Sequence, residues 1–379
     1  MSNDPSCIEA LYEQVVAKIA ERRNQAKKDL PFPKFFSYLE NLGWVQLFGF
    51  DINRSYEDAD YATEIQFRIK LYNMDKFDDD AYVDASLGAT IGMYWDLPLI
   101  GVGVRHQADG VPIFSEDHPI RKSPDLRLMK PHDFYASGEM PKLLKFYDRM
   151  LEIARGRFSV SFPTWCRGPL DMAIALRGYE QFVEDTVERP QFVHGLMQYL
   201  IDERMRWWDA YLGHFNYTDR GAMIADDWIN IPFITPAMFE EFCMPYYLQL
   251  EKYHGRISTV HSCGNKVPVQ KIMLGIKSST DYEVNHWTDL DATLENIPSD
   301  KFLCVNLLNT EVLLAGPAKM ESDLRRITGK CAGRRYQVVA TAIEKVHEDM
   351  AEDIAQVQRW IAIARKVFGR DRHLEAPAD

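Results

Sequence analysis

The stretch ISTVHSCGN, residues 257–265, joins a short β-branched run to an imidazole, a thiol and a turn. Ile257 to Val260 predict a strand, because β-branched side chains favour extended backbone. His261 and Cys263 follow two residues apart, so in extended chain both point to the same side. Zinc accepts both ligand types, and a catalytic zinc keeps one position free. The stretch therefore predicts a strand whose carboxyl end carries half of a zinc site.

From about residue 150 onward, short apolar runs of this kind alternate with helical patterns. Two helices are predicted from apolar residues at helical spacing, over 191–212 and 237–254. The predicted strands are 158–165, 222–228, 257–263, 280–284, 302–307 and 336–342. Alternation of strand and helix implies a parallel sheet.

Two further runs, 45–50 and 89–94, bring the number of units close to eight. Polar residues recur at the predicted strand ends, and a (β/α)8 barrel collects its active site at that rim. They are Asp226, Asp227, His261, Cys263, Glu283, Asn306 and Glu344. We expect an α/β fold of this type over residues 45–379, preceded by a helical extension over 1–44. Residues 96–134 form a long irregular insertion that we place over the barrel mouth.

Composition narrows the class of protein. A formal net charge of −12 with no basic block argues against nucleic acid as a partner. No basic and apolar leader opens the chain and no apolar run approaches the roughly 20 residues needed to cross a bilayer, so we expect a cytoplasmic protein without membrane contact. Six scattered cysteines do not read as a disulfide framework. Asp78-Asp79-Asp80 reads as a solvated loop.

Several cofactor and enzyme classes lack their sequence signatures. The chain has no phosphate-binding Gly-x-x-x-x-Gly-Lys-Ser/Thr run, and Gly101-Val102-Gly103 lacks the third glycine of a dinucleotide site. No Gly-x-Ser-x-Gly elbow supports a serine hydrolase. The remaining ligands of a zinc site must come from other strand ends, where the candidates are Asp226, Glu283, Cys304, Glu344 and His347.

An ordered set of motifs resembles the uroporphyrinogen decarboxylase-like superfamily over roughly residues 51–369. In chain order the motifs are Gly168-Pro169-Leu170-Asp171-Met172-Ala173 with Gly178, Asp226-Asp227-Trp228, Ile234-Thr235-Pro236-Ala237-Met238-Phe239, Pro245-Tyr246, His261-x-Cys263-Gly264-Asn265, and Val305-Asn306-Leu307 with Leu313 to Gly316. The arginine-rich N-terminal motif of the porphyrin decarboxylases is missing near residues 30–43. The chain therefore looks like the zinc-dependent branch, the corrinoid and coenzyme M methyltransferases, whose fold is a (β/α)8 barrel.

The resemblance implies that His261 and Cys263 are zinc ligands. The third ligand of the branch is a cysteine after the last strand, and Ile343 stands at that position here. Its neighbour Glu344 is the replacement that we expect. A carboxylate makes the zinc more oxygen-seeking, which favours an O-methyl donor such as a methoxylated aromatic.

The resemblance further implies transfer of a methyl group to or from the cobalt of a corrinoid (cobalamin) carried by a partner protein. We expect Asp227 or Glu283 to donate the proton to the departing oxygen, given a pKa raised by burial. Trp165, Asp226, Trp228 and Asn306 are expected to contact a small methylated substrate. The alternatives are a decarboxylase on the same barrel, a methylcobamide:thiol methyltransferase, and a non-catalytic corrinoid- or ligand-binding protein. The sequence leaves the direction of transfer and assembly into a homo-oligomer open.

Overall fold

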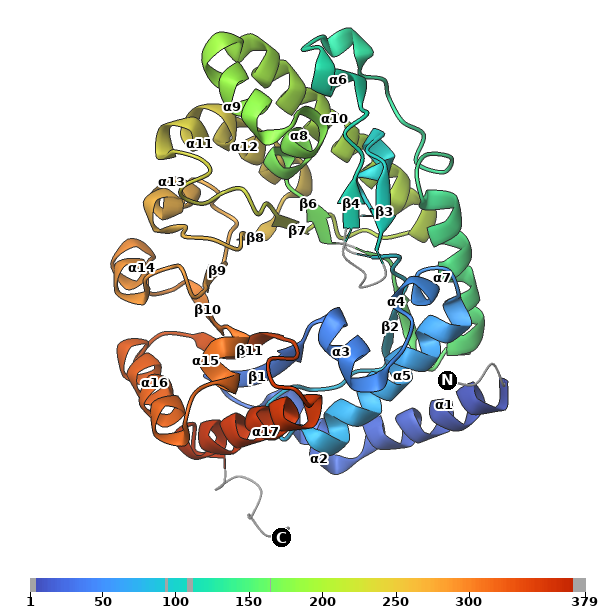
Figure 1. Cartoon of the computed structure of the whole chain (residues 1–379), viewed down its shortest axis with the longest axis vertical. Helices are drawn as coiled ribbons and strands as arrows, with labels where there is room; N and C mark the ends of the chain where they lie inside the picture. The colour runs from blue at the N-terminus through green and yellow to red at the C-terminus, as the bar shows by residue number, and fades with distance from the viewer. Residues whose placement is uncertain (1–4, 93–94, 108–111, 164, 371–379) are drawn as a thin grey trace.

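The computed structural model describes residues 5–92, 95–107, 112–163 and 165–370. The chain folds as a (β/α)8 barrel, with the strands around the centre and the helices outside (Figure 1). The barrel strands are β1 Lys34–Leu39, β2 Ser86–Gly88, β5 Ser159–Ser161 with its continuation β6 Trp165–Arg167, β7 Ala222–Ala225, β8 Ile257–His261, β9 Asp281–Val284, β10 Phe302–Leu307 and β11 Tyr336–Ile343. The predicted fold class is confirmed.

Neighbouring barrel strands run parallel. Strand β2 pairs with β5, the order β6-β7-β8 follows, and β9-β10-β11-β1 completes the ring. Between β8 and β9 the backbone N–H of Thr280 donates to the carbonyl of Ser258 at 3.0 Å. Residues on β10 alternate, with Leu303, Val305 and Leu307 buried and the polar residues between them half-buried. Parallel strands place all their carboxyl ends on one rim, where the polar residues gather.

Acidic side chains link β1 to the segment that leads into β2. The Asp80 carboxylate accepts from the backbone N–H of Phe35, and its own N–H donates to the Phe35 carbonyl at 3.0 Å. Asp79 accepts from the N–H and hydroxyl of Ser37, both at 2.8 Å. Asp80 also pairs with buried Arg370. The solvated loop predicted for residues 78–80 is therefore wrong for Asp79 and Asp80, which are 4% and 2% exposed.

The first barrel strand lies upstream of its predicted position. Residues 45–50 belong mostly to helix α3, Asn41–Phe48, which ends at Gly49 in the left-handed conformation, φ 65°. Strand β1 falls inside the range 1–44 that we assigned to a helical extension. A six-residue apolar run fits a buried helix as well as a strand, so periodicity could not separate them. Strand β2 lies just before the predicted run 89–94, of which Met93 and Tyr94 are outside the described residues.

The remaining elements are helices and one small hairpin. The helices are α1 Pro5–Ala20, α2 Arg22–Ala26, α4 Ile52–Ser55, α5 Ala59–Lys76, α6 Pro119–Lys122, α7 Met140–Ala154, α8 Pro169–Arg177, α9 Tyr179–Glu188, α10 Pro190–Phe215, α11 Pro236–Phe242, α12 Met244–His254, α13 Gln270–Met273, α14 Leu290–Asn296, α15 Asn309–Leu313, α16 Pro317–Lys330 and α17 Met350–Val367. Short 3-10 turns are η1 Lys27–Asp29, η2 Pro98–Ile100, η3 Leu126–Leu128 and η4 Val267–Val269. None of the helices in the described ranges is long and apolar enough to cross a membrane.

Two predicted helices have different outcomes. The prediction for 191–212 is confirmed by α10. The single helix predicted over 237–254 is two helices that meet at Cys243. Pro245 lies in the first turn of α12, where a backbone N–H has no acceptor within the helix, so the proline costs no helical hydrogen bond.

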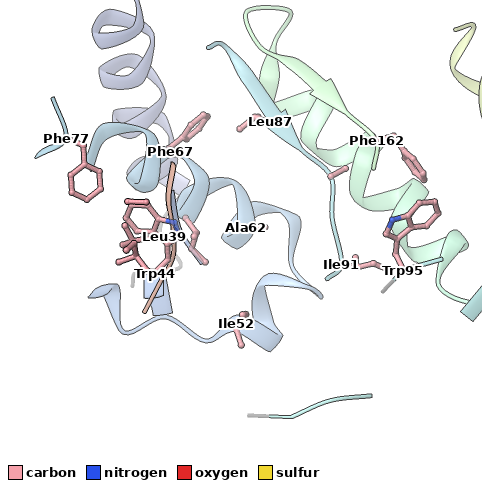
Figure 2. Packing of buried hydrophobic residues seen from close by; sticks show 14 of the residues in the cluster. Leu39, Trp44, Ile52, Ala62, Phe67, Phe77, Leu87, Ile91, Trp95 and Phe162 are labelled. Carbon is pink, nitrogen blue, oxygen red and sulfur yellow. The ribbon is translucent and has the colours of Figure 1, made fainter. Parts of the chain in front are cut away.

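The core fills the space between the strands and the surrounding helices. Figure 2 shows part of it, with Leu39 of β1, Trp44 of α3 and Phe67 of α5 in one cluster of buried residues. On the other side of this cluster, Trp95 packs against Phe162 with the ring centroids 5.7 Å apart. Helix α1 joins the same core, since Tyr12 contacts Phe67 edge-on. The segment after Trp95 begins the insertion.

The insertion contains a two-stranded antiparallel hairpin. It consists of β3 Val104–His106 and β4 Pro112–Phe114, and helix α6 follows it. Val104 and Phe114 of the hairpin pack against the core cluster that includes buried residues of α10, and the two overlap in the view of Figure 1. The insertion thus reaches the site described below.

Candidate metal centre and substrate pocket

Three ligand-type side chains meet at the carboxyl ends of β7 and β8. Ala225, the last residue of β7, pairs with His261, the last residue of β8. Asp227 follows two residues after Ala225, and Cys263 follows two residues after His261. Nε2 of His261 lies 3.2 Å from Sγ of Cys263 and 3.4 Å from Oδ1 of Asp227. One ligand atom from each of the three residues lies within 4.8 Å of the other two. The structure therefore brings His261 and Cys263 together, with Asp227 as the third group.

This donor set fits a zinc ion. An imidazole nitrogen, a thiolate and a carboxylate are the ligands that zinc takes in proteins, and three of them leave a position for substrate. Asp227 and His261 are half-buried and Cys263 is exposed, so the cluster has one open side. The residues present are consistent with a catalytic rather than a closed structural site.

Glu283 and Lys266 support His261 from behind. Oε2 of Glu283, on β9, lies 2.6 Å from Nδ1 of His261 and 3.4 Å from Nζ of Lys266. The Lys266 side chain is 4% exposed. A carboxylate on one ring nitrogen fixes the tautomer and turns the other nitrogen toward a metal. Glu283 is therefore placed to position His261 and not to touch substrate.

The expected pKa shifts of the two proposed acids are wrong in direction. Burial raises the pKa of Glu283, but the charge of Lys266 and the hydrogen bond to His261 outweigh it and lower the pKa to about 2. Burial likewise opposes ionisation of Asp227, yet His261 and Arg167 hold its pKa well below the usual range. Both side chains are paired carboxylates, so neither is a proton donor in this structure.

His261 carries the matching positive charge in the metal-free protein. Burial lowers its pKa, but hydrogen bonding to Asp227, Cys263 and Glu283 outweighs burial and raises the pKa to about 12. A metal at Nε2 must displace that proton.

Asp226 stabilises the fold and does not contact a substrate. It is fully buried, and its carboxylate accepts from the backbone N–H groups of Leu170 and Asp171 at 3.0 and 2.9 Å and from the Tyr247 hydroxyl. It thus caps the first turn of α8, and a Cβ on Gly168 would overlap it, at 2.1 Å from Oδ2. The predicted substrate contact of Asp226 is wrong, because α8 and Tyr247 occupy both of its oxygens.

Arg167 connects this buried network to the cluster. Its Nη1 lies 2.5 Å from Asp171 and 3.1 Å from Oδ2 of Asp227. Its own backbone N–H donates to the buried Asp96 carboxylate at 2.6 Å. Asp227 is therefore held between a guanidinium on one side and His261 on the other.

A pocket of about 640 Å³ opens beside Asp227. Trp228 stacks on Tyr179, with centroids 5.0 Å apart and planes 15° from parallel, and meets Phe233 edge-on. The remaining lining residues are Leu97, Phe114, Glu116, Arg121, Arg167, Asp171, Ile174, Ala175 and Gly178. Four of these come from the insertion, as expected for a segment over the barrel mouth. Trp228, which we expected to contact the substrate, lines this pocket.

The other predicted residues lie elsewhere. Glu344 follows β11, is half-buried and does not join the cluster. Burial and the charge of Glu344 raise the pKa of Glu40. Asn306 accepts from the Cys304 thiol at 3.2 Å on β10. His347 pairs with Asp353 at 2.6 Å. The side chain of Trp165 lies outside the described residues.

Sequence reasoning missed Arg121, Arg167, Asp171, Tyr179 and Lys266. Arg167 ends β6 directly before the motif that starts at Gly168, which is a usable signal for a rim residue. Lys266 follows Gly264-Asn265 by one residue. Arg121 and Tyr179 carry no signal in sequence, because only the path of the insertion brings them together.

Comparison with known proteins supports the fold. The family model described as uroporphyrinogen decarboxylase (URO-D) matches residues 51–360. Among solved structures, the chain is similar to a methyltransferase from Methanosarcina mazei, with a TM-score of 0.65 and 15% sequence identity, over 92% of this chain and 99% of that chain. No curated protein matches the chain.

Proposed function

Since the chain belongs to the uroporphyrinogen decarboxylase family, we propose that it is a zinc-dependent methyltransferase that moves a methyl group between a small methylated substrate and the cobalt of a corrinoid protein. The observation that carries the proposal is the grouping of Asp227, His261 and Cys263, of which Asp227 also lines an aromatic pocket. A metal-free decarboxylase has no use for a thiol and an imidazole held 3.2 Å apart. The similarity to a methyltransferase barrel agrees with this assignment.

We assign the zinc ligands as Asp227, His261 and Cys263, with Asp227 in the place that we had expected Glu344 to take. When bound, zinc supplies a Lewis acid that polarises the oxygen carrying the methyl group. Glu283 holds the His261 ring in orientation, and Lys266 keeps Glu283 ionised. Arg167 fixes the second oxygen of Asp227 at 3.1 Å. These residues position and charge the site without taking part in covalent chemistry.

An aromatic methyl ether is the donor that the pocket favours. Trp228, Tyr179 and Phe233 offer ring faces and edges to a planar ring, and a pocket of about 640 Å³ accommodates a single-ring compound. Asp227 and Glu283, the two acids that we had expected to protonate the leaving oxygen, are both paired with cations. A phenolate, whose conjugate acid resembles tyrosine with a pKa of about 10, leaves without protonation far more readily than an aliphatic alkoxide.

The test combines metal content with methyl transfer. We expect about one zinc per chain in the wild type and in Glu344→Gln, and its loss in Cys263→Ala and Asp227→Asn. With 4-methoxybenzoate and cob(I)alamin, zinc-loaded wild type should form methylcobalamin, followed by its absorbance. A wild type that binds no zinc, or that releases carbon dioxide from a carboxylic acid substrate without methyl transfer, would favour the decarboxylase instead. Methylation of a thiol from methylcobalamin, without ether cleavage, would favour the thiol methyltransferase.

A further inference from the structure

A second guanidinium faces the pocket from the insertion. Arg121 is the third residue of the short helix α6, and its side chain is 25% exposed. It lines the same pocket as Asp227, Trp228 and Tyr179. The pocket therefore has a metal-ligand group and an aromatic wall, and it also has a cation supplied by a separate segment of the chain.

The backbone under Arg121 is anchored. Arg177, itself buried and paired with Asp185 at 2.6 Å, donates to the carbonyl oxygens of Ile120 and Arg121 at 3.1 and 2.6 Å. Gly178 has φ 89°, and a Cβ there would lie 3.3 Å from the Arg121 guanidinium. The glycine lets the guanidinium lie close to the backbone of the α8–α9 junction. The Arg121 guanidinium is therefore held at this wall of the pocket in two ways. Arg177 binds the main chain at Arg121, and Gly178 has no side chain to push the guanidinium away.

The present partner of Arg121 is weakly held. Within the described residues its carboxylate partner is Glu116, at 2.9 Å, and the Glu116 side chain is 76% exposed. Solvent-exposed ion pairs contribute about 0–1 kcal/mol. Arg167 offers a contrast, since it is 4% exposed and bound to both Asp171 and Asp227. A ligand anion can replace Glu116 on Arg121 at little cost, whereas it cannot displace the buried carboxylates from Arg167.

We propose that Arg121 determines specificity for an aromatic substrate that carries a carboxylate, which it binds in place of Glu116. The inference rests on the proposed function, which puts the ether end of the substrate toward Asp227. Arg121 binds the opposite end of the molecule, and the ring lies against Trp228 and Tyr179. A guanidinium binds a carboxylate through two parallel N–H donors, which fixes orientation as well as affinity. The pocket thus selects a methoxylated aromatic acid over its neutral amide.

The experiment compares two probes by calorimetry on the purified full chain, 4-methoxybenzoate and the neutral 4-methoxybenzamide. Wild type should bind the benzoate at least tenfold more tightly, the scale of one charged hydrogen-bonded pair. Arg121→Gln should lose that preference while keeping its affinity for the benzamide within about threefold. Glu116→Gln should bind the benzoate more tightly than wild type, because the competing carboxylate is gone.

Arg127→Gln is the matched control, since Arg127 lies in the same insertion, is 90% exposed and pairs with Asp125 outside the pocket. It should leave both affinities unchanged. The proposal is overturned by equal affinity for the two probes, by no binding of either, by a parallel loss of both in Arg121→Gln, or by an unchanged benzoate affinity in Glu116→Gln. Glu116 is too exposed for its replacement to unfold the chain, so that variant gives a result even where Arg121→Gln misfolds. Failure of the methyltransferase assignment would give a different result. The wild type would still bind the benzoate more tightly than the benzamide, but it would transfer no methyl group.

Discussion

Glu283 lies 2.6 Å from Nδ1 of His261, across the β8–β9 interface, and so leaves Nε2 of the same ring facing Cys263 and Asp227. The carboxylate at the end of β9 sets the orientation of the imidazole at the end of β8. A residue that looks like a catalytic acid in the sequence therefore orients an imidazole of the candidate metal centre.

Replacement of this support should weaken metal binding without abolishing it. Glu283→Gln keeps the shape but removes the charge, and loss of such a partner typically costs 10- to 100-fold in metal affinity. Zinc competition with a coloured chelator measures the change. Asp281→Asn, two residues earlier on β9, removes the same charge and should bind zinc like wild type. Wild-type zinc affinity in Glu283→Gln would remove the positioning role.

Zinc binding should release protons. His261 has its pKa raised to about 12 in the metal-free protein, so at neutral pH its ring is protonated and must lose a proton to ligate. Affinity for zinc should therefore rise with pH, by at least tenfold per unit between about pH 6.5 and 9. Calorimetry in buffers of different ionisation enthalpy counts the protons. An affinity independent of pH over that window would contradict a protonated His261 in the metal-free protein.

Trp228, which stacks on Tyr179 in the pocket wall, should contribute to substrate binding and not to turnover. Trp228→Ala removes the ring that stacks on Tyr179, and aromatic pairs contribute about 0.5–1.5 kcal/mol beyond their buried area. We expect KM for a methoxylated aromatic to rise roughly tenfold with kcat nearly unchanged, the pattern of lost uniform binding. Trp287→Ala is the control, since Trp287 is 54% exposed and does not line this pocket. A large loss of kcat alone in Trp228→Ala would contradict this role.

Asp226 should matter for folding. Asp226→Ala leaves two backbone donors of α8 and the Tyr247 hydroxyl without their acceptor, at about 1–3 kcal/mol for such a buried loss. Urea unfolding at neutral pH measures it, and Tyr247→Phe should cost less because it removes one donor only. If both variants unfold at the wild-type urea concentration, the cap contributes nothing to stability.

The buried ion pair between Arg370 and Asp80, next to strand β1, should contribute to stability. Arg370→Gln leaves Asp80 buried without its cation, and breaking a buried ion pair typically costs 3–5 kcal/mol of unfolding free energy. Asp78→Asn is the control from the same acidic run, because Asp78 is 33% exposed and its replacement should cost about 1 kcal/mol or less. Thermal and urea unfolding should rank the two variants in that order. Equal stability of Arg370→Gln and Asp78→Asn would mean that the ion pair between Arg370 and Asp80 does not stabilise the fold.

The sequence by itself determined the barrel class and the pair His261 and Cys263. Both depend on local pattern: β-branched runs between amphipathic helices define the alternation, and two residues of extended chain place the imidazole and the thiol on one side. The pocket position of Trp228 follows in the same way from its place just after a strand. Local pattern failed at residues 45–50, where an apolar run of six fits helix and strand equally, and the left-handed Gly49 ends a helix.

Only the tertiary structure decided which third side chain joins His261 and Cys263, and the ionisation of the acids. Asp227 joins the cluster because β7 and β8 are neighbours in register, whereas Glu344, after β11, lies outside it. The low pKa of Glu283 comes from Lys266 and His261, which are 17 and 22 residues away in the chain. Arg121 lines the same pocket as Trp228 because the insertion folds back over the mouth of the barrel. The third side chain of the cluster, the pKa of Glu283 and the position of Arg121 all depend on contacts between residues remote in the chain. A local sequence pattern carries no information on such contacts.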